Sequence, residues 1–129
     1  MDLQTLNENY VYKYDRKLDS WQVMKPENGK YYGDCEDYSL TVLFCIVSNG
    51  SWFTFWKLLF TKAKMHYVEN NGGHAVLQVD GKYIDNWTKE WVTKEHMESL
   101  GHKFHRYQYL PFQVALKMLI GKVACLIRY

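Results

Sequence analysis

Residues 73–87 have the sequence GHAVLQVDGKYIDNW, which predicts a two-stranded β-hairpin. The dipeptide Asp80-Gly81 is among the strongest short hairpin signals, and apolar, β-branched and aromatic residues dominate the runs on either side of it. If Asp80-Gly81 is a two-residue turn, Val79 pairs with Lys82, and this single pairing sets the register of both strands. The hairpin therefore gives a frame on which the remaining side chains can be placed.

In this register, His74 and Asp85 lie on the same face of the hairpin, because side chains alternate between faces along a strand. They are diagonal neighbours, roughly 7–8 Å apart at the backbone, which is within side-chain reach. A one-residue slip of the register would place them on opposite faces. The spacing thus permits the Asp85 carboxylate to hold one ring nitrogen of His74 and leaves the other nitrogen for a second partner.

Cys35 lies at the predicted start of a helix. Gly33-Asp34 precedes it, Asp34 is a good N-cap, and a strongly apolar run extends from residue 38 to 47 before Ser48-Asn49-Gly50 ends the helix. A helix N-terminus lowers the pKa of a thiol, because the helix dipole and the free N–H groups favour the thiolate. The order of Cys35, His74 and Asp85 then matches a nucleophile, its base and the group that orients the base. Taken singly, each residue also fits a structural role, as a buried thiol, a packed histidine or a turn former.

The rest of the chain predicts an α+β fold, with helices packed on one antiparallel sheet. We interpret the other four histidines (His66, His96, His102 and His105) as surface or packed residues. We expect helices at 3–14, 34–49, 51–60, 93–100 and 112–120, and strands at 62–69, 73–79, 82–87, 104–110 and 123–127.

Composition limits the classes of function. The chain of 129 residues fits one domain (1–129), and its net charge of +2 comes from interspersed acids and bases, which gives no basic stripe for nucleic acid. The first residues, MDLQ, have neither the basic start nor the apolar core of a signal peptide, so we expect a cytoplasmic protein. The longest apolar stretch, 40–47, is far shorter than the ~20 residues that span a bilayer.

The cysteines also favour a reducing compartment. Cys35, Cys45 and Cys125 are odd in number and widely spaced, which predicts free thiols rather than a disulfide framework. They lack the paired spacing of a structural zinc site.

Three motifs resemble the bacterial transglutaminase-like cysteine proteinases, a group within the papain-like, transglutaminase-core superfamily. The motifs are GDCEDYS (33–39), HAVL (74–77) and IDN (84–86), and the upstream pieces Tyr14-Asp15, Trp21 and Pro26 are similar too. The resemblance covers about residues 10 to 87, and no family motif follows position 87. It implies a central helix bearing the nucleophile Cys35, packed on an antiparallel sheet. That sheet would carry His74, as general base and then acid, and the orienting Asp85.

The acids around Cys35 require a partner, because nearby anions raise the pKa of a thiol. Carboxylates in a first helical turn cap N–H groups, but a hard cation with oxygen ligands would also neutralise them. In adhesin-cleaving members of the resembling family, flanking acids bind calcium, and the matching positions here are Asp34 and Glu36. For the oxyanion hole, the Cys35 N–H is the natural donor, with Trp21 or Gln22 as the second. We consider core packing the better interpretation of Trp21.

We therefore predict a thiol hydrolase that cleaves a peptide or amide bond of a protein or peptide substrate through a thioester. No cofactor is required for this chemistry, with calcium as an addition. Deamidation or transamidation of glutamine uses the same machinery and stays open. The rival hypothesis is a non-catalytic binding or structural module on the same scaffold, with a phage as one source, since phages also encode small members of the group. The oligomeric state is not predicted.

Overall fold

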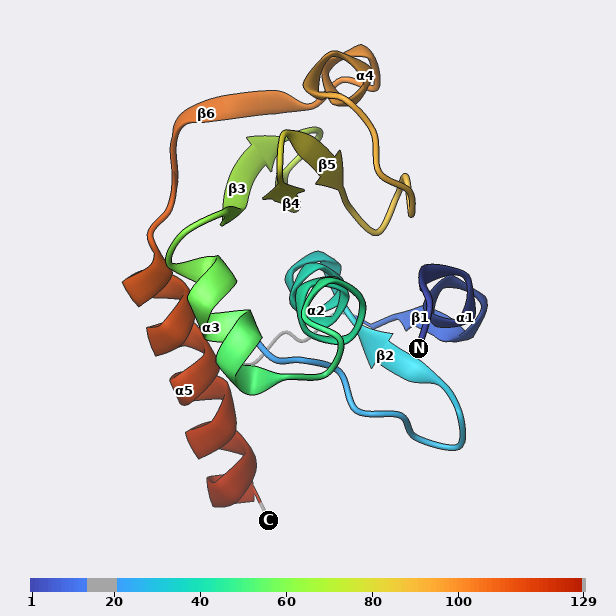
Figure 1. Cartoon of the computed structure of the whole chain (residues 1–129), viewed down its shortest axis with the longest axis vertical. Coiled ribbons are helices and arrows are strands. Elements are labelled where there is room, and N and C mark those ends of the chain that lie inside the picture. The colour runs from blue at the N-terminus through green and yellow to red at the C-terminus, as the bar shows by residue number, and fades with distance from the viewer. Residues whose placement is uncertain (14–20, 129) are drawn as a thin grey trace.

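A four-stranded sheet lies in the upper part of the structure as seen in Figure 1, and helices pack beneath it. The computed structural model describes residues 1–13 and 21–128, apart from the side chains of 105–107 and 121–128. Neighbouring strands in the sheet are antiparallel, and their order is β5-β4-β3-β6. The strands are β3 Ala63–Glu69, β4 Gly73–Val79, β5 Lys82–Ile84 and β6 Lys103–Tyr109. The α+β class is as predicted.

The hairpin of β4 and β5 has the predicted register. Val79 pairs with Lys82, and Leu77 pairs with Ile84. Asp80 and Gly81 have φ angles of 51° and 77°, which is the left-handed backbone that a two-residue hairpin turn requires. However, β5 ends at Ile84 and not at the predicted residue 87. The next segment is a turn, because the N–H groups of residues 87 and 88 are hydrogen-bonded to the carboxylate of residue 85.

The predicted central helix starts at Cys35. Helix α2, Cys35–Thr41, has Asp34 as its N-cap, and the side chain of Asp37 completes a capping box with the Asp34 main chain. The helix continues as a wider π-helical segment, η1 Val42–Val47, which sequence periodicity did not indicate. The chain leaves this segment through Gly50, whose φ of 79° favours glycine. Helix α2 packs against β4 and so brings Cys35 to the sheet.

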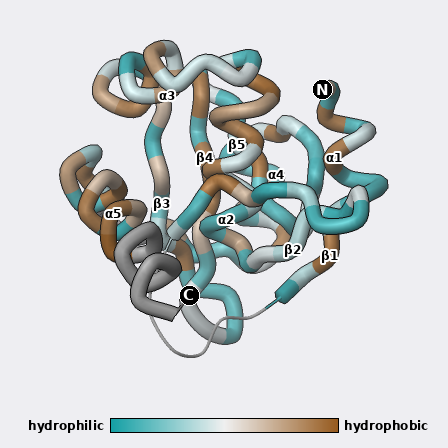
Figure 2. Tube along the Cα trace, turned by 90° about the horizontal axis from the view of Figure 1, so that it is seen from below, coloured by the Kyte–Doolittle hydropathy of each residue, from teal (hydrophilic) through white to brown (hydrophobic). Residues whose placement is uncertain are grey.

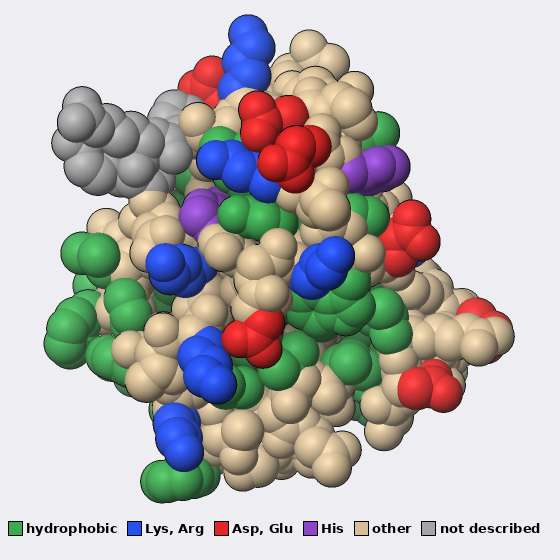
Figure 3. Space-filling view, turned by 45° about the horizontal axis from the view of Figure 1, so that its top comes forward, with side chains coloured by type: hydrophobic (Ala, Val, Ile, Leu, Met, Phe, Trp, Pro, Cys, Tyr) green, Lys and Arg blue, Asp and Glu red, His purple; other side chains and the backbone are tan. Residues whose placement is uncertain are grey.

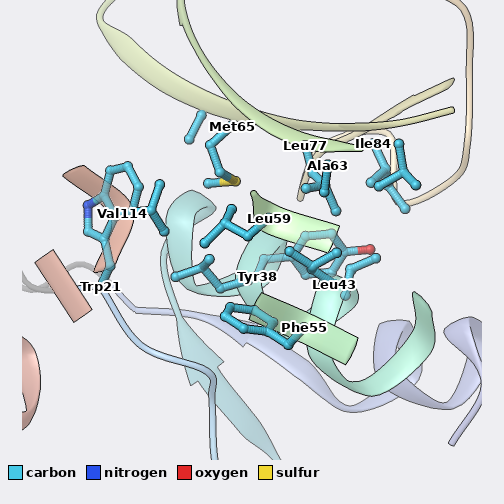
Figure 4. Close-up of a cluster of buried hydrophobic side chains, with 14 of the residues drawn as sticks. Trp21, Tyr38, Leu43, Phe55, Leu59, Ala63, Met65, Leu77, Ile84 and Val114 are labelled. Carbon is cyan, nitrogen blue, oxygen red and sulfur yellow. The ribbon is translucent and has the colours of Figure 1, made fainter. Parts of the chain in front are cut away.

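The core lies between the sheet and the helices beneath it. In Figure 4, Met65 and Leu77 project from the strands toward Tyr38 of α2, Leu43 of η1 and Leu59 at the end of the next helix, α3 (Trp52–Leu59). All of these side chains are buried. Burial of each large apolar side chain contributes about 1.5–3 kcal/mol, so this layer fixes α2 against the sheet and limits the freedom of residues at the start of α2.

Helix α3, Trp52–Leu59, is capped by the side chain of Ser51. Its aromatic residues divide between core and surface: Phe55 is buried, whereas Phe53 is 79% exposed. The last helix, α5 Pro111–Arg128, begins with proline at its first position. Figure 2 shows hydrophobic positions along α5.

The predicted strand 123–127 is wrong, because α5 continues through those residues. β-Branched residues at 123 and 127 suggested a strand. The apolar positions 116, 119, 120, 123 and 127 also follow helical spacing, and this longer pattern prevails.

The N-terminal prediction is wrong in its length. Helix α1 covers only Leu3–Asn9, and the next residues form β1, Tyr10–Tyr12, instead of continuing the helix to residue 14. Strand β1 pairs in parallel with β2, Tyr31–Gly33. Aromatic and β-branched residues favour strands, and a pairing partner about 20 residues away cannot be identified from the local pattern. Residues 14 and 15 lie outside the described part of the chain.

Helix α4, Lys94–Ser99, is capped by Thr93 and comes between β5 and β6 in the sequence. Its bounds are close to the predicted 93–100. On the face seen in Figure 3, acidic and basic side chains are interspersed. Among the described residues, none of the helices has the length and apolar character needed to cross a membrane alone. The bent pair formed by Cys35–Val47 and Trp52–Leu59 meets that criterion only when its two parts are taken together.

Candidate active site

Cys35 and His74 lie in one cleft, although 38 intervening residues separate them in the sequence. Cys35 is the first residue of α2 and is partly buried, while His74 is the second residue of β4 and is 4% exposed. The cleft has a volume of about 330 Å³, and its lining consists of Tyr12, Cys35, Gly73, His74, Asn86 and Trp87. The helix and the sheet thus bring the predicted nucleophile and base to the same opening.

His74 and Asp85 are hydrogen-bonded, as the hairpin register predicted. The distance from His74 Nε2 to Asp85 Oδ2 is 2.8 Å, and both side chains are buried. Because Nε2 faces the carboxylate, Nδ1 is the ring nitrogen that remains for another partner. The diagonal placement gives this contact although β5 stops one residue before Asp85.

The Asp85 carboxylate is held by donors on both oxygens. Its Oδ1 accepts hydrogen bonds from the main-chain N–H of Trp87 (3.0 Å) and from the N–H and hydroxyl of Thr88 (2.7 and 3.0 Å). Burial alone would raise the pKa of Asp85, but hydrogen bonds from His74, His102 and Thr88 outweigh it and hold the pKa below its usual value. Asp85 is therefore an ionised and fixed acceptor at neutral pH.

The indole of Trp87 covers one side of His74. The two rings are stacked, with centroids 4.0 Å apart and planes at 15°. Trp87 is 52% exposed, so its outer face meets solvent while its inner face shields the imidazole. The shielded His74–Asp85 hydrogen bond is consequently kept from water on that side.

The sulfur of Cys35 has a different hydrogen-bond partner from the one the sequence suggested. Within the described part of the chain, Sγ is hydrogen-bonded to Glu36 Oε2 at 3.3 Å, and not to His74. Burial raises the pKa of the Cys35 thiol, and the charge of Glu36 raises it further, while a hydrogen bond from the Ala75 main chain acts in the opposite direction. Cys35 is thus a neutral thiol in this state, so a nearby base is needed to make it nucleophilic.

The carboxyl groups of Glu36 and Asp37, close to Cys35, are partly protonated at neutral pH. Burial and the neighbouring Asp34 raise the pKa of Glu36 to about 7 and that of Asp37 to about 8. Asp34 Oδ1 caps the N–H of Asp37, so one of the two predicted calcium ligands also has a structural role. Calcium at Asp34 and Glu36 stays a prediction, since two carboxylates supply fewer than the 6–8 oxygens that the ion requires.

The residues predicted for the oxyanion hole occupy different environments. The N–H of Cys35 is in the first turn of α2, where helical N–H groups have no acceptor within the helix. Trp21 is buried in the core, with its ring edge-on to Tyr109 at 4.7 Å, which agrees with the packing interpretation. Gln22 is exposed, and its main-chain N–H donates to Asp37 Oδ1 at 3.0 Å. This bond ties the segment before α2 to the first turn of the helix.

Sequence reasoning missed His102. It interpreted this residue as a surface or packed histidine. His102 is packed, at 2% exposed, but the 2.7 Å contact of its Nε2 with Asp85 Oδ2 was not predicted. His66 is half-buried and hydrogen-bonded to Gln78, His96 is exposed, and the side chain of His105 is outside those described. The proximity of His102 to Asp85 depends on how β6 pairs with β3, and the sequence carried no signal for that pairing.

The group of His74, Asp85 and His102 has the residue types of a metal site, with candidate ligand atoms within 4.8 Å of one another. The distances of 2.7 and 2.8 Å between ring nitrogens and carboxylate are those of charge-assisted hydrogen bonds. Asn70 Nδ2 lies 3.0 Å from His102 Nδ1 and 3.1 Å from the Leu100 carbonyl, which accepts only. Nδ1 is therefore the acceptor and Nε2 carries the proton, which favours a hydrogen-bonded cluster over metal ligation.

Comparison of the chain with protein-family models, with curated proteins and with solved structures finds no match. The interpretation of the site therefore depends on its own geometry.

Proposed function

We propose that the protein is a cysteine-dependent hydrolase that cleaves an amide bond of a peptide or protein. The observation that carries this proposal is the hydrogen-bonded pair of His74 and Asp85 at 2.8 Å, in a cleft that Cys35 also lines. The chain order Cys, His, Asp and the placement of Cys35 at the start of a helix that packs on β4 agree with a papain/transglutaminase-like core. That fold assignment is part of the proposal.

The first half-reaction would form a thioester. His74 Nδ1 takes the proton of the Cys35 thiol as sulfur attacks the carbonyl carbon, and Asp85 stabilises the imidazolium through Nε2. The carbonyl oxygen becomes an oxyanion, and the N–H of Cys35 at the helix start is the donor proposed for it. When the carbon–nitrogen bond breaks, His74 returns its proton to the leaving amine.

The second half-reaction would release the acid. His74 removes a proton from water as its oxygen attacks the thioester carbon, and the carbon–sulfur bond breaks. The departing thiolate of Cys35 then recovers the proton from His74. An amine in place of water would give transamidation by the same steps.

The resting thiol must leave Glu36 before the first step. Rotation of the Cys35 side chain away from Oε2 would break the 3.3 Å contact and free the sulfur for His74, with which Cys35 shares the cleft. The raised pKa of Cys35 means that proton transfer to His74 accompanies attack, since little thiolate exists beforehand. A slow, substrate-dependent reaction is expected, in contrast to a preformed thiolate.

The test is site-resolved alkylation near neutral pH, with the labelled peptides quantified by mass spectrometry. Because His74 can take the thiol proton as sulfur attacks iodoacetamide, Cys35 is expected to react faster than Cys45 despite its raised pKa, and His74→Ala is expected to remove that difference. His96→Ala is the matched control, because His96 is exposed on α4. A peptide library with and without an added primary amine then separates hydrolysis from amine transfer. Reaction of Cys35 that is unaffected by His74→Ala would contradict the proposal.

The raised pKa of Cys35 also favours a second candidate, a non-catalytic binding module that retains the same residues. In that case Cys35 and Cys45 would be alkylated at similarly slow rates, and Cys35→Ala would bind its partner as the wild type does. The alkylation experiment therefore discriminates between the two candidates.

A further inference from the structure

Asp85 has a second buried histidine as a partner. His102 Nε2 lies 2.7 Å from Asp85 Oδ2, the same oxygen that His74 Nε2 contacts at 2.8 Å. The two imidazole rings meet at an angle of 70°, with centroids 5.2 Å apart. One carboxylate oxygen thus accepts from two imidazoles that approach from different directions. The reaction proposed above uses only His74, so the burial of His102 calls for another explanation.

Asn70 fixes which nitrogen of His102 carries the proton. Its amide nitrogen donates to the Leu100 carbonyl at 3.1 Å, which sets the orientation of the amide, and contacts His102 Nδ1 at 3.0 Å. A flipped amide would place two oxygens against each other. Nδ1 must accept, so the neutral imidazole has its hydrogen on Nε2 and donates it to Asp85.

We propose that His102, oriented by Asn70, is a positioning residue for Asp85 and, through it, for His74; this role rests on the proposed function. The side chains form the chain Asn70, His102, Asp85, His74, which ends at the cleft of Cys35. His102 does not line that cleft. It reaches the site through its hydrogen bond to Asp85 and through ring contacts with His74 and Trp87.

The physical effect of His102 is to hold the carboxylate. Donors from the turn fix Oδ1, and His102 fixes Oδ2, so Asp85 cannot rotate away when His74 changes its protonation state. Without the His102 donor, one lone pair of a buried carboxylate would lack a partner, and the Asp85 side chain would gain freedom. Partners that orient metal-ligating residues contribute about 10- to 100-fold to activity, and we expect the same order for the partner that orients Asp85.

The first experiment compares His102→Phe with His102→Gln by the rate of Cys35 alkylation. Phenylalanine keeps a planar ring but has no donor, whereas the glutamine amide can place an N–H near the position of Nε2. We expect His102→Phe to slow alkylation about 10- to 100-fold and His102→Gln to restore most of the rate. His96→Phe is the control for the loss of an exposed histidine. Thermal melting of each variant reports folding, and equal impairment of folded Phe and Gln variants would overturn the positioning role.

The second experiment is NMR of the imidazole nitrogens in the wild-type protein and in Asn70→Ala. We expect His102 to be the tautomer protonated at Nε2, and the Asn70→Ala change to mix the two tautomers. A wild-type His102 protonated at Nδ1, or both imidazoles bound to zinc in the purified protein, would overturn the proposal. If wild-type alkylation does not depend on His74, the proposed function itself fails. If it depends on His74 but not on the His102 donor, only the positioning role fails.

Discussion

The thiol of Cys35 donates its hydrogen bond to Glu36, the next residue in the first turn of α2, with an Sγ–Oε2 distance of 3.3 Å. After burial, the charge of Glu36 is the strongest contribution to the raised pKa of Cys35. The replacement Glu36→Gln keeps an acceptor of similar size but removes the charge. We expect the pKa of the thiol to fall and alkylation near neutral pH to become several-fold to tenfold faster, since one pKa unit changes the thiolate fraction tenfold.

The control for this change is Glu95→Gln, which also alters an acid in the first turn of a helix, at an exposed position of α4. The pH dependence of Cys35 alkylation, measured in both variants, gives the thiol pKa directly. An unchanged or slower reaction in Glu36→Gln would show that Glu36 assists the sulfur instead of restraining it.

Calcium is expected to act on the same contact. If Asp34 and Glu36 bind the ion, as the resemblance implies, their charge is neutralised and Cys35 reacts faster when calcium is added. Chelation should reverse the effect, and Glu36→Gln should abolish the response, because that variant lacks the carboxylate. Calorimetric titration of the wild type and of Glu36→Gln measures binding without reference to activity. Heat of binding that is identical in the two proteins would place the ion elsewhere.

Asp85→Asn is expected to distinguish the role of Asp85 in orienting His74 from its role in stability. Both imidazoles donate to Oδ2, and main-chain N–H groups of the turn donate to Oδ1. An asparagine amide nitrogen would therefore face N–H donors in either orientation, and the side chain could not accept all of these hydrogen bonds. We expect a loss of roughly 10³–10⁴-fold in turnover, the order of magnitude found when the orienting aspartate of a catalytic triad becomes asparagine. Stability should fall as well, by about 3 kcal/mol, because the change breaks a buried charged network. Turnover and denaturant unfolding, measured together, divide the two effects.

Asp80→Asn is the matched control, since it changes an aspartate of the same hairpin at a position where asparagine is equally suited to the turn. Turnover in Asp85→Asn within a fewfold of the wild type would argue against Asp85 as the orienting group.

The hairpin and the start of α2 could be predicted because each depends on local chemistry. Asp80-Gly81 sets the register, and this register alone brings His74 and Asp85 together. Asp34 caps the helix on which Cys35 lies. Three of the residues that form the candidate site could therefore be identified from the amino-acid sequence alone.

The contacts that were missed depend on pairing over long distances. The parallel pairing of β1 with β2 connects segments about 20 residues apart, and His102 reaches Asp85 because β6 returns along β3. The rotamer that joins Cys35 to Glu36 instead of His74 depends on local burial, which a motif does not encode. Local sequence thus predicts the residues of the site better than it predicts their partners.

Asp37 predicts how stability varies with pH. It is buried, and burial together with the charge of Asp34 raises its pKa to about 8, against roughly 3.9 for an unfolded aspartate. The folded state therefore binds a proton that the unfolded state has lost between these two values. The contribution of Asp37 to stability is complete below about pH 4. It decreases as the pH rises toward about 8, by at most about 1.4 kcal/mol per pH unit. Glu36, with a pKa of about 7, acts in the same direction.

Asp85 acts in the opposite direction, because its pKa is lowered in the folded state. Its contribution to stability is lost only as the pH falls below the pKa of an unfolded aspartate. The free energy of unfolding should therefore be greatest in mildly acidic solution and smaller at about pH 8. In Asp37→Asn, the amide oxygen can still accept from the Gln22 N–H, but the titrating proton is gone. The amide nitrogen cannot accept the hydrogen bond that Asp37 Oδ2 accepts from the Asp34 N–H. We therefore expect the variant to be less stable than the wild type at about pH 5, by roughly 1 kcal/mol. The deficit should shrink or reverse at about pH 8.

Urea unfolding at several pH values, with Glu98→Gln as an exposed-carboxylate control, measures this crossing. A stability difference between Asp37→Asn and the wild type that stays constant from about pH 5 to about pH 8 would mean that Asp37 is already ionised in the folded protein. Its carboxylate would then be stabilised by the N–H groups of Gln22 and Asp34 more strongly than burial disfavours it. In that case the first turn of α2 would carry an additional negative charge beside Cys35, and Glu36→Gln alone would lower the thiol pKa by less than expected.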